Sequence, residues 1–152
     1  LKLGIGISTV ERIATTLEKK RTYYLKKEKV WIQFRMNCAR NKGANCNVRQ
    51  ILISRKPLSE KKTTFKQVGT FSQIIDGVKI GDTPNKIILK YGTPSIVIKP
   101  AKDKTFSALR EDFDLKNGEI VRYLSGNIDE LFLVEFYFDS DGLNSVLISC
   151  DE

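Results

Sequence analysis

Residues 77–94 read GVKIGDTPNKIILKYGTP, and this stretch decides the predicted fold. A capping side chain precedes Pro84, and proline is favoured at the first position of a helix because it has no N–H to leave unpaired. Ile87 and Tyr91 then recur at the spacing of one helical face. Gly92 is a favoured helix-ending residue, and the proline two positions later excludes further helix. The stretch therefore predicts a short amphipathic helix.

Alternating apolar and polar residues predict antiparallel strands on both sides of this helix. Asp141-Gly142 is a favoured hairpin turn and separates the last two of them. The hydrophilic residues 99–117 are interpreted as an extended loop. The predicted strands are residues 23–25, 30–37, 48–54, 96–98, 119–124, 132–138 and 146–148.

The first half of the chain repeats the order of the second. Ser8 and Glu11 have the spacing of a capping box, and the apolar face of the helix predicted there extends to Leu17. Leu52-Ile53-Ser54 recurs as Leu147-Ile148-Ser149. We therefore expect an α+β fold in which two tandem helix-plus-antiparallel-sheet units form one sheet, with the helices packed on one face. The predicted parts of this single compact domain are a first unit at 1–56, a linker at 57–69 and a second unit at 70–152.

The turn Gly77-Val78-Lys79-Ile80-Gly81-Asp82-Thr83 and the exit Tyr91-Gly92-Thr93-Pro94 resemble the opening of the SmpA/BamE-like and β-lactamase-inhibitor-protein-like superfamily. The closing hairpin at 132–149 is similar to that of the same superfamily. The resemblance covers most of residues 70–152, and the first half resembles a second copy that lacks the Gly-x-Pro exit. Tandem copies are typical of the inhibitor branch. These motifs shape a turn and a helix, so they indicate a fold and no chemistry.

The resemblance implies a bacterial protein that is periplasmic or secreted and that works by binding. Its members act as scaffolds in envelope assembly or as inhibitors of enzymes. A lipoprotein-like anchor, attached through an N-terminal segment upstream of this sequence, belongs to the same expectation. No functional residue is carried over from the superfamily, because its contact surfaces vary.

The composition argues against catalysis. The 152 residues include no histidine, which removes the commonest general base and a frequent metal ligand. No carboxylate pair, activated nucleophile or cofactor motif stands out, so we expect no enzyme activity, no cofactor and no metal site. No apolar run reaches the ~18–20 residues that a membrane-spanning helix needs.

The charge is unevenly distributed along the chain. Residues 1–76 hold 17 basic and 5 acidic side chains, a net charge of +12, whereas residues 77–152 hold 9 basic and 13 acidic, a net charge of −4. This polarity is typical of a basic face turned toward an anionic partner. A lysine-rich solvated surface is the alternative interpretation.

Basic and aromatic residues are densest between Lys19 and Trp31, where they suit an acidic protein or another anionic component of the cell envelope. Anionic lipid, through peripheral membrane contact, is an alternative partner, and nucleic acid is a less favoured one. A strand edge protected by lysines needs no partner at all. The predicted partner-binding residues are Lys19, Lys20, Arg21, Tyr23, Tyr24, Lys26, Lys27, Lys29 and Trp31, with Arg40 and Lys42 at a hairpin tip.

The three cysteines bear on the compartment in which the protein works. Cys38 and Cys46 flank a turn-like segment between two predicted strands, which places them across the mouth of a hairpin. A disulfide there indicates an oxidising compartment, and two reduced thiols in a cytosolic protein are the alternative. Cys150 is interpreted as a buried free thiol. The sequence as a whole predicts a non-enzymatic, extracytoplasmic binding module.

Overall fold

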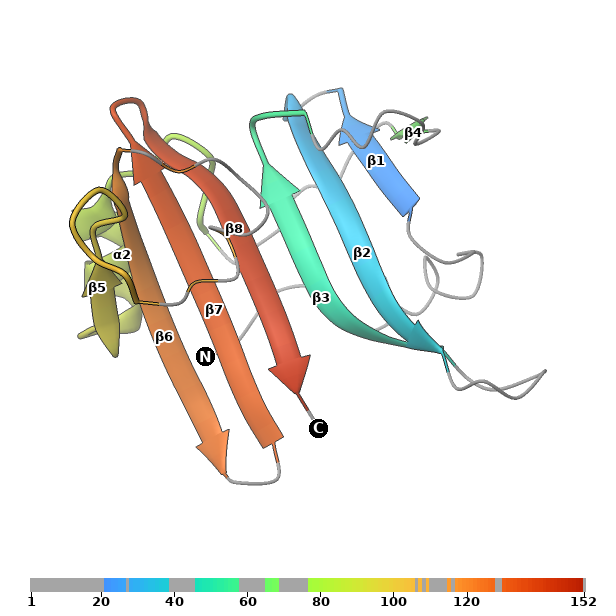
Figure 1. Ribbon diagram of the computed structural model, residues 1–152. Helices are drawn as coiled ribbons and strands as arrows, with labels where there is room; N and C mark the ends of the chain where they lie inside the picture. Colours follow the sequence, from blue (N-terminus) through green and yellow to red (C-terminus); the bar gives the residue numbers. More distant parts are fainter. Residues whose placement is uncertain are drawn as a thin grey trace.

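A computed structural model shows the chain as one broad, twisted sheet (Figure 1). The structure describes residues 21–26, 28–38, 46–57, 65–68, 77–105, 107, 109, 115, 117–127 and 130–151. Its strands are β1 (Arg21–Leu25), β2 (Val30–Cys38), β3 (Cys46–Ser54), β4 (Phe65–Val68), β5 (Ile96–Ile98), β6 (Glu119–Asn127), β7 (Glu130–Asp139) and β8 (Gly142–Asp151). One helix, α2 (Pro84–Tyr91), precedes β5.

The sheet has the strand order β4-β1-β2-β3-β8-β7-β6-β5. Every pair of neighbours is antiparallel except β1 and β4, which are parallel. The two halves of the chain meet in the middle, where β3 and β8 lie side by side (Figure 1). The chain therefore forms one continuous sheet across both halves.

The predicted fold class, an α+β fold of two tandem helix-plus-sheet units, is wrong. The described residues form a predominantly antiparallel sheet of eight strands, and α2 is the one helix whose bounds lie among them. Residues 65–68 belong to the predicted linker, yet they form β4 and pair with β1. The helix expected after Ser8 lies outside the described residues. Capping signals report local preference, whereas pairing between distant strands decides this architecture.

The local predictions for the second half are confirmed, except for the exact position of one turn. Thr83 caps α2 by accepting a hydrogen bond from the backbone N–H of Lys86, and proline occupies the first helical position. The backbone N–H of Gly92 donates to the Ile88 carbonyl, and the helix ends at this glycine, whose φ of 83° is positive. The strands predicted at 96–98, 119–124 and 132–138 lie within β5, β6 and β7. The turn into β8 lies one residue earlier than predicted, at Ser140-Asp141, because Gly142 is already the first residue of β8 and pairs with Asp139.

The strands predicted for the first half are confirmed as well. Residues 23–25, 30–37 and 48–54 lie within β1, β2 and β3. Alternation along β2 places Val30, Ile32 and Phe34 in the core, as a strand with one face turned to the interior requires. The predicted strand positions thus hold, although the fold class built on them does not.

The main hydrophobic core lies on the face of the sheet that α2 covers, which we call the helix face. Ile87 of α2 is fully buried there against Val121, Phe136 and their neighbours. Tyr91 stacks on Phe136 with ring centroids 5.8 Å apart. A smaller cluster of Leu52, Ile98, Leu109, Leu115, Ile120, Tyr137 and Leu147 lies on the opposite face. The sheet is thus buried on both faces near its centre.

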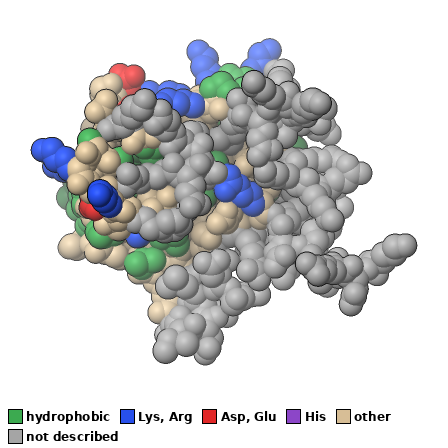
Figure 2. All heavy atoms as spheres, viewed as in Figure 1, with side chains coloured by type: hydrophobic (Ala, Val, Ile, Leu, Met, Phe, Trp, Pro, Cys, Tyr) green, Lys and Arg blue, Asp and Glu red, His purple; other side chains and the backbone are tan. Residues whose placement is uncertain are grey.

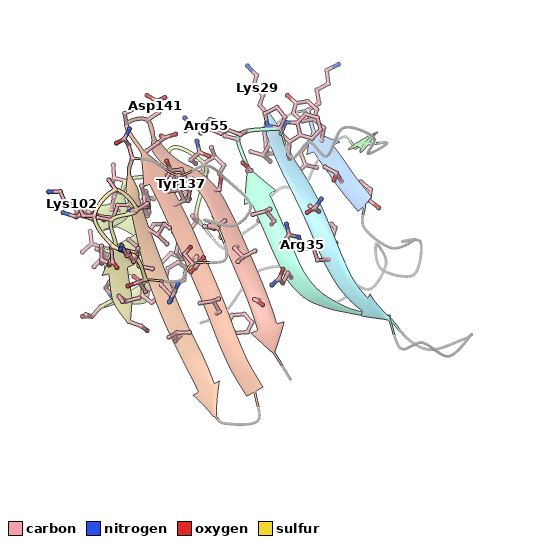
Figure 3. The ribbon with its side chains drawn as sticks, viewed as in Figure 1. Lys29, Arg35, Arg55, Lys102, Tyr137 and Asp141 are labelled. Atoms are coloured by element: carbon pink, nitrogen blue, oxygen red, sulfur yellow. The ribbon has the colours of Figure 1, made fainter. Side chains whose placement is uncertain are left out.

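The turn before α2 docks on the hairpin between β7 and β8. The Gly81 N–H donates to the Leu143 carbonyl, and the Leu143 N–H donates to the carbonyl of Asp82. A Cβ atom on Gly142 would lie 2.4 Å from the carbonyl oxygen of Gly81, so only glycine permits this approach. Arg55, just after β3, donates to the carbonyls of Asp141 and Leu143 (Figure 3). These contacts tie the entry of α2 to both halves of the sheet.

Strands on one side of the β3–β8 pair match strands on the other side, residue by residue. Leu52 and Leu147 are direct partners there, so the recurring Leu-Ile-Ser tripeptides start opposite each other. Counting outward from this pair, Gln33 matches Glu135 in the next strands, and Thr22 matches Arg122 in the strands beyond. The order β1-β2-β3 is thus repeated as β6-β7-β8 in matching register. This is the arrangement that a duplication of three strands would produce.

No helix among the described residues is long and apolar enough to cross a membrane.

The backbone register sets Cys38 of β2 directly opposite Cys46 of β3. Directly opposed residues in an antiparallel pair have Cα atoms about 4.5–5.5 Å apart, within the usual range for a disulfide. We expect a Cys38–Cys46 bridge in protein isolated from an oxidising compartment, with Cys150 free. Closing this short loop would stabilise the protein by about 2–3 kcal/mol in the chain-entropy model.

Peptide mapping under non-reducing conditions checks the connectivity, and urea unfolding with and without reductant checks the magnitude. Free thiols at both positions, in protein kept oxidised throughout purification, would contradict the bridge.

Candidate binding face

The face of the sheet opposite α2 carries most of the polar strand residues, and we call it the polar face. Pairing across the sheet arranges its side chains in three transverse rows. The first row contains Ile98, Ile120, Tyr137, Ser145, Ser54, Trp31 and Tyr24. The second contains Ile96, Arg122, Glu135, Leu147, Leu52, Gln33 and Thr22. The third contains Leu124, Leu133, Ser149, Gln50 and Arg35.

One end of the first row forms the aromatic corner, which we define as Tyr24 and Trp31 together with Lys26 and Lys29 of the adjoining turn. The two rings are cross-strand partners with centroids 4.9 Å apart and planes tilted by 46°. Both aromatic residues are half-buried, and both lysines are exposed. Lys29 has a φ of 54°, a left-handed conformation that non-glycine residues rarely adopt. The turn therefore presents two cations beside an accessible aromatic pair. Figure 3 labels one of the two cations, Lys29.

A chain of polar side chains crosses four strands of the polar face. Gln33 donates to the hydroxyl of Thr22, and Arg35 donates to the side-chain carbonyls of Gln33 and Gln50, at 3.1 and 3.3 Å. Gln50 donates in turn to the hydroxyl of Ser149 on β8. Arg35 and Gln50 are half-buried, whereas the other members are buried. The chain fixes the orientation of the Arg35 guanidinium and links the two halves of the sheet.

The other half of the second row holds a buried ion pair. Glu135 is fully buried, and one of its carboxylate oxygens accepts from Nε and Nη2 of Arg122 at 2.8 and 2.6 Å. The second oxygen accepts from the hydroxyl of Ser107 and from the backbone N–H of Leu109. Four donors therefore satisfy one carboxylate, which offsets the cost of burying its charge. The pair anchors part of the 99–117 segment against the sheet.

Two tyrosine hydroxyls of the second half act as structural donors. Tyr137 donates to the carbonyl of Asn117 at 2.7 Å, and Tyr123 donates to the carbonyl of Gly92 at 2.8 Å. Burial raises the pKa of Tyr123, and burial together with the negative charge of Asp139 raises the pKa of Tyr137. Both hydroxyls therefore stay protonated at neutral pH and are unsuited to act as bases.

The partner-binding residues predicted from the sequence do not all lie at one place in the structure. Tyr24, Lys26, Lys29 and Trp31 come together at the aromatic corner. Tyr23 points to the other side of β1 and is 9% exposed, with its ring 6.0 Å from that of Phe34, so it belongs to the core. Arg21 lies in β1 by its backbone. Lys19, Lys20, Lys27, Arg40 and Lys42 lie outside the residues that the structure describes.

Sequence reasoning missed the polar chain and the buried ion pair. The alternation of β2 placed Gln33 and Arg35 on the face away from the core, but pairing with Gln50 could not be read without the register. Glu135 is the one acidic residue in the apolar run 131–138 of β7, and that isolation was the available signal for a buried carboxylate with a partner.

Nothing in the described part of the chain gathers the groups needed to hold a metal: no three His, Cys, Asp or Glu side chains are placed together. Figure 2 shows lysine and arginine side chains at several places on the surface. Lys26 and Lys29 are exposed in the turn between β1 and β2, and Lys99, Lys102 and Lys104 are exposed in the segment after β5. The arrangement suits contact with a partner through shape, charge and aromatic area.

Comparison of the chain with protein-family models, curated proteins and solved structures finds no match.

The buried ion pair gives a direct test of the packing on the polar face. Glu135→Leu should destabilise the fold by about 3–5 kcal/mol, because it removes the carboxylate that faces the Arg122 guanidinium in a largely buried site. The double variant Glu135→Leu/Arg122→Met should recover part of that loss, since both charges are then removed. Urea unfolding of the two single variants and the double variant measures the coupling. Strictly additive losses would show that the two side chains are not coupled.

Proposed function

We propose that this chain is a non-enzymatic binding module that works outside the cytoplasm, as an envelope scaffold or a protein inhibitor. The observation that carries the proposal is the aromatic corner. Tyrosine and tryptophan dominate the energetics of protein interfaces because they offer large contact area with few rotatable bonds. Here one of each is held in mutual contact and half-exposed beside two exposed lysines.

The charge distribution supports an acidic protein as the partner. The first 76 residues carry a net charge of +12, and the aromatic corner lies within them. Lysines at the rim of an interface accelerate encounter with an acidic surface, whereas buried aromatic anchors slow its dissociation. The two kinds of side chain at this corner therefore have separable kinetic roles.

The pairing of Cys38 with Cys46 across β2 and β3 supports a location in an oxidising compartment. A cross-strand pair such as Cys38 and Cys46 is placed for a structural disulfide, and such bridges persist in oxidising compartments. The superfamily resemblance of residues 70–152 implies the same location. The periplasmic or secreted location stays a proposal that rests on these two lines.

Nucleic acid or anionic lipid is the alternative partner, and the lysines favour it. Exposed lysines beside aromatic rings can neutralise phosphates while the rings stack on bases. Such binding weakens steeply as salt rises, with a slope set by the number of phosphates contacted. A single-stranded oligonucleotide and anionic vesicles, titrated at two salt concentrations, test this alternative directly.

The partner is identified by crosslinking the protein in the cells that make it, and its binding kinetics are then measured with purified components. Lys26→Glu/Lys29→Glu should slow association severalfold and reduce its salt dependence. Tyr24→Ala should speed dissociation about tenfold, as expected for loss of an aromatic anchor. Lys102→Glu/Lys104→Glu makes the same charge change at exposed sites on the other half and is the matched control.

The proposal fails if the charge reversals at the aromatic corner and at Lys102/Lys104 have equal effects, or if Tyr24→Ala leaves dissociation unchanged in a folded protein. Tight, salt-sensitive binding of the oligonucleotide or vesicles, with no protein crosslinked, would favour the alternative.

A further inference from the structure

The strand correspondence relates the aromatic corner to a second apolar pair on the same face. Tyr24 and Trp31 are cross-strand partners in β1 and β2, and Leu124 and Leu133 are the corresponding partners in β6 and β7. Both pairs lie on the polar face, because each residue alternates with a core residue of the helix face. We call Leu124 and Leu133 the aliphatic corner.

The aliphatic corner is accessible. Leu124 is 45% exposed and Leu133 is half-buried, although leucine is a residue that folding normally buries. The following residues, Ser125 and Gly126, are exposed and uncharged. A single exposed leucine is ordinary, but this one belongs to a cross-strand apolar pair in the position that matches the aromatic pair.

The two corners are diagonally placed across the sheet. Four interstrand spacings of about 4.8 Å separate the centres of the two pairs, and the first and third rows lie about 13 Å apart along the strands, so the diagonal is about 20–25 Å. A standard protein interface of about 800 Å² per partner is about 30 Å across if it is roughly circular, so one partner can cover both corners. Between the corners run the half-buried Arg35 and Gln50, which the polar chain holds in place.

We propose that a folded protein partner contacts both corners at once, which extends the proposed function and rests on it. Its surface carries an apolar patch with acidic neighbours to meet the aromatic corner and its lysines. A second, uncharged apolar patch about 20–25 Å away meets the aliphatic corner. Nucleic acid does not fit this surface as a whole, since leucine has no aromatic face on which a base can stack.

A photoreactive amino acid placed singly at Tyr24, Leu124 and Leu89 of the full chain tests the proposal in the cells that produce it. Leu89 is the matched control, because it is 88% exposed on α2, on the opposite side of the sheet. The same protein should be identified by mass spectrometry in the adducts from positions 24 and 124, and it should be absent from position 89.

An adduct from position 24 alone would overturn the two-corner surface and leave the proposed function standing. No protein adduct from either corner would overturn both. Adducts that disappear on nuclease treatment, or equal capture of the partner at position 89, would also contradict the two-corner surface.

Once the partner has been identified by photocrosslinking, a matched pair of leucine variants measures how much the aliphatic corner contributes to the affinity for it. Leu124→Ala should weaken affinity about tenfold, through faster dissociation, because it removes an interface anchor. Leu89→Ala makes the same chemical change away from the surface and should leave affinity unchanged. If Leu124→Ala binds as the unmodified protein does while Tyr24→Ala weakens binding, the aliphatic corner plays no part.

Discussion

The pairing of β3 with β8 is the constraint on which the rest of the structure depends. It joins residues almost a hundred positions apart and is the pairing through which β1–β4 and β5–β8 become one sheet. Leu52 and Leu147 are opposed on the polar face, and Ile53 and Val146 are opposed on the helix face. The junction is therefore buried on both faces, and hydrophobic burial there offsets the entropy of closing a long loop.

Polar side chains mark both ends of this junction. Gln50 donates to the Ser149 hydroxyl at one end, and the hydroxyls of Ser54 and Ser145 lie 3.0 Å apart at the other. Because side chains alternate between faces, a slip of one residue would move the leucines to the helix face and these polar groups with them. The register at the junction thus fixes which residues can meet on the polar face. The positions of the aromatic corner, the polar chain and the ion pair relative to one another all depend on this register.

The sequence allowed seven of the eight described strands and α2 to be predicted, because alternation and capping are local signals. The fold class was not predictable in the same way. Cap and helix patterns suggested two helix-bearing units, whereas β4 arose within a segment taken for a linker and paired parallel to β1. The continuous apolar runs Ile51-Leu52-Ile53 and Val146-Leu147-Ile148 were the available sign of central strands buried on both faces. Neither run indicates that these two strands pair with each other.

In the candidate site, too, local features could be predicted from the sequence, whereas features that depend on strand pairing could not. Four of the predicted contact residues, Tyr24, Lys26, Lys29 and Trp31, lie together because they flank one tight turn. Tyr23 was misplaced because composition cannot say which of two adjacent tyrosines faces the core; the register settles it. The aliphatic corner had no signal in the sequence, since it gains meaning only from its place in the sheet relative to the aromatic pair.

Native-state hydrogen exchange shows whether both halves form one cooperative sheet through the β3–β8 pair. In that case the amides of residues 50–54 and 145–149 exchange among the slowest in the protein. Their opening free energies should agree within about 1 kcal/mol, as expected for strands that open in one cooperative unit. Fast exchange of residues 50–54 beside slow exchange of residues 145–149 would contradict the account, because the halves would then open independently.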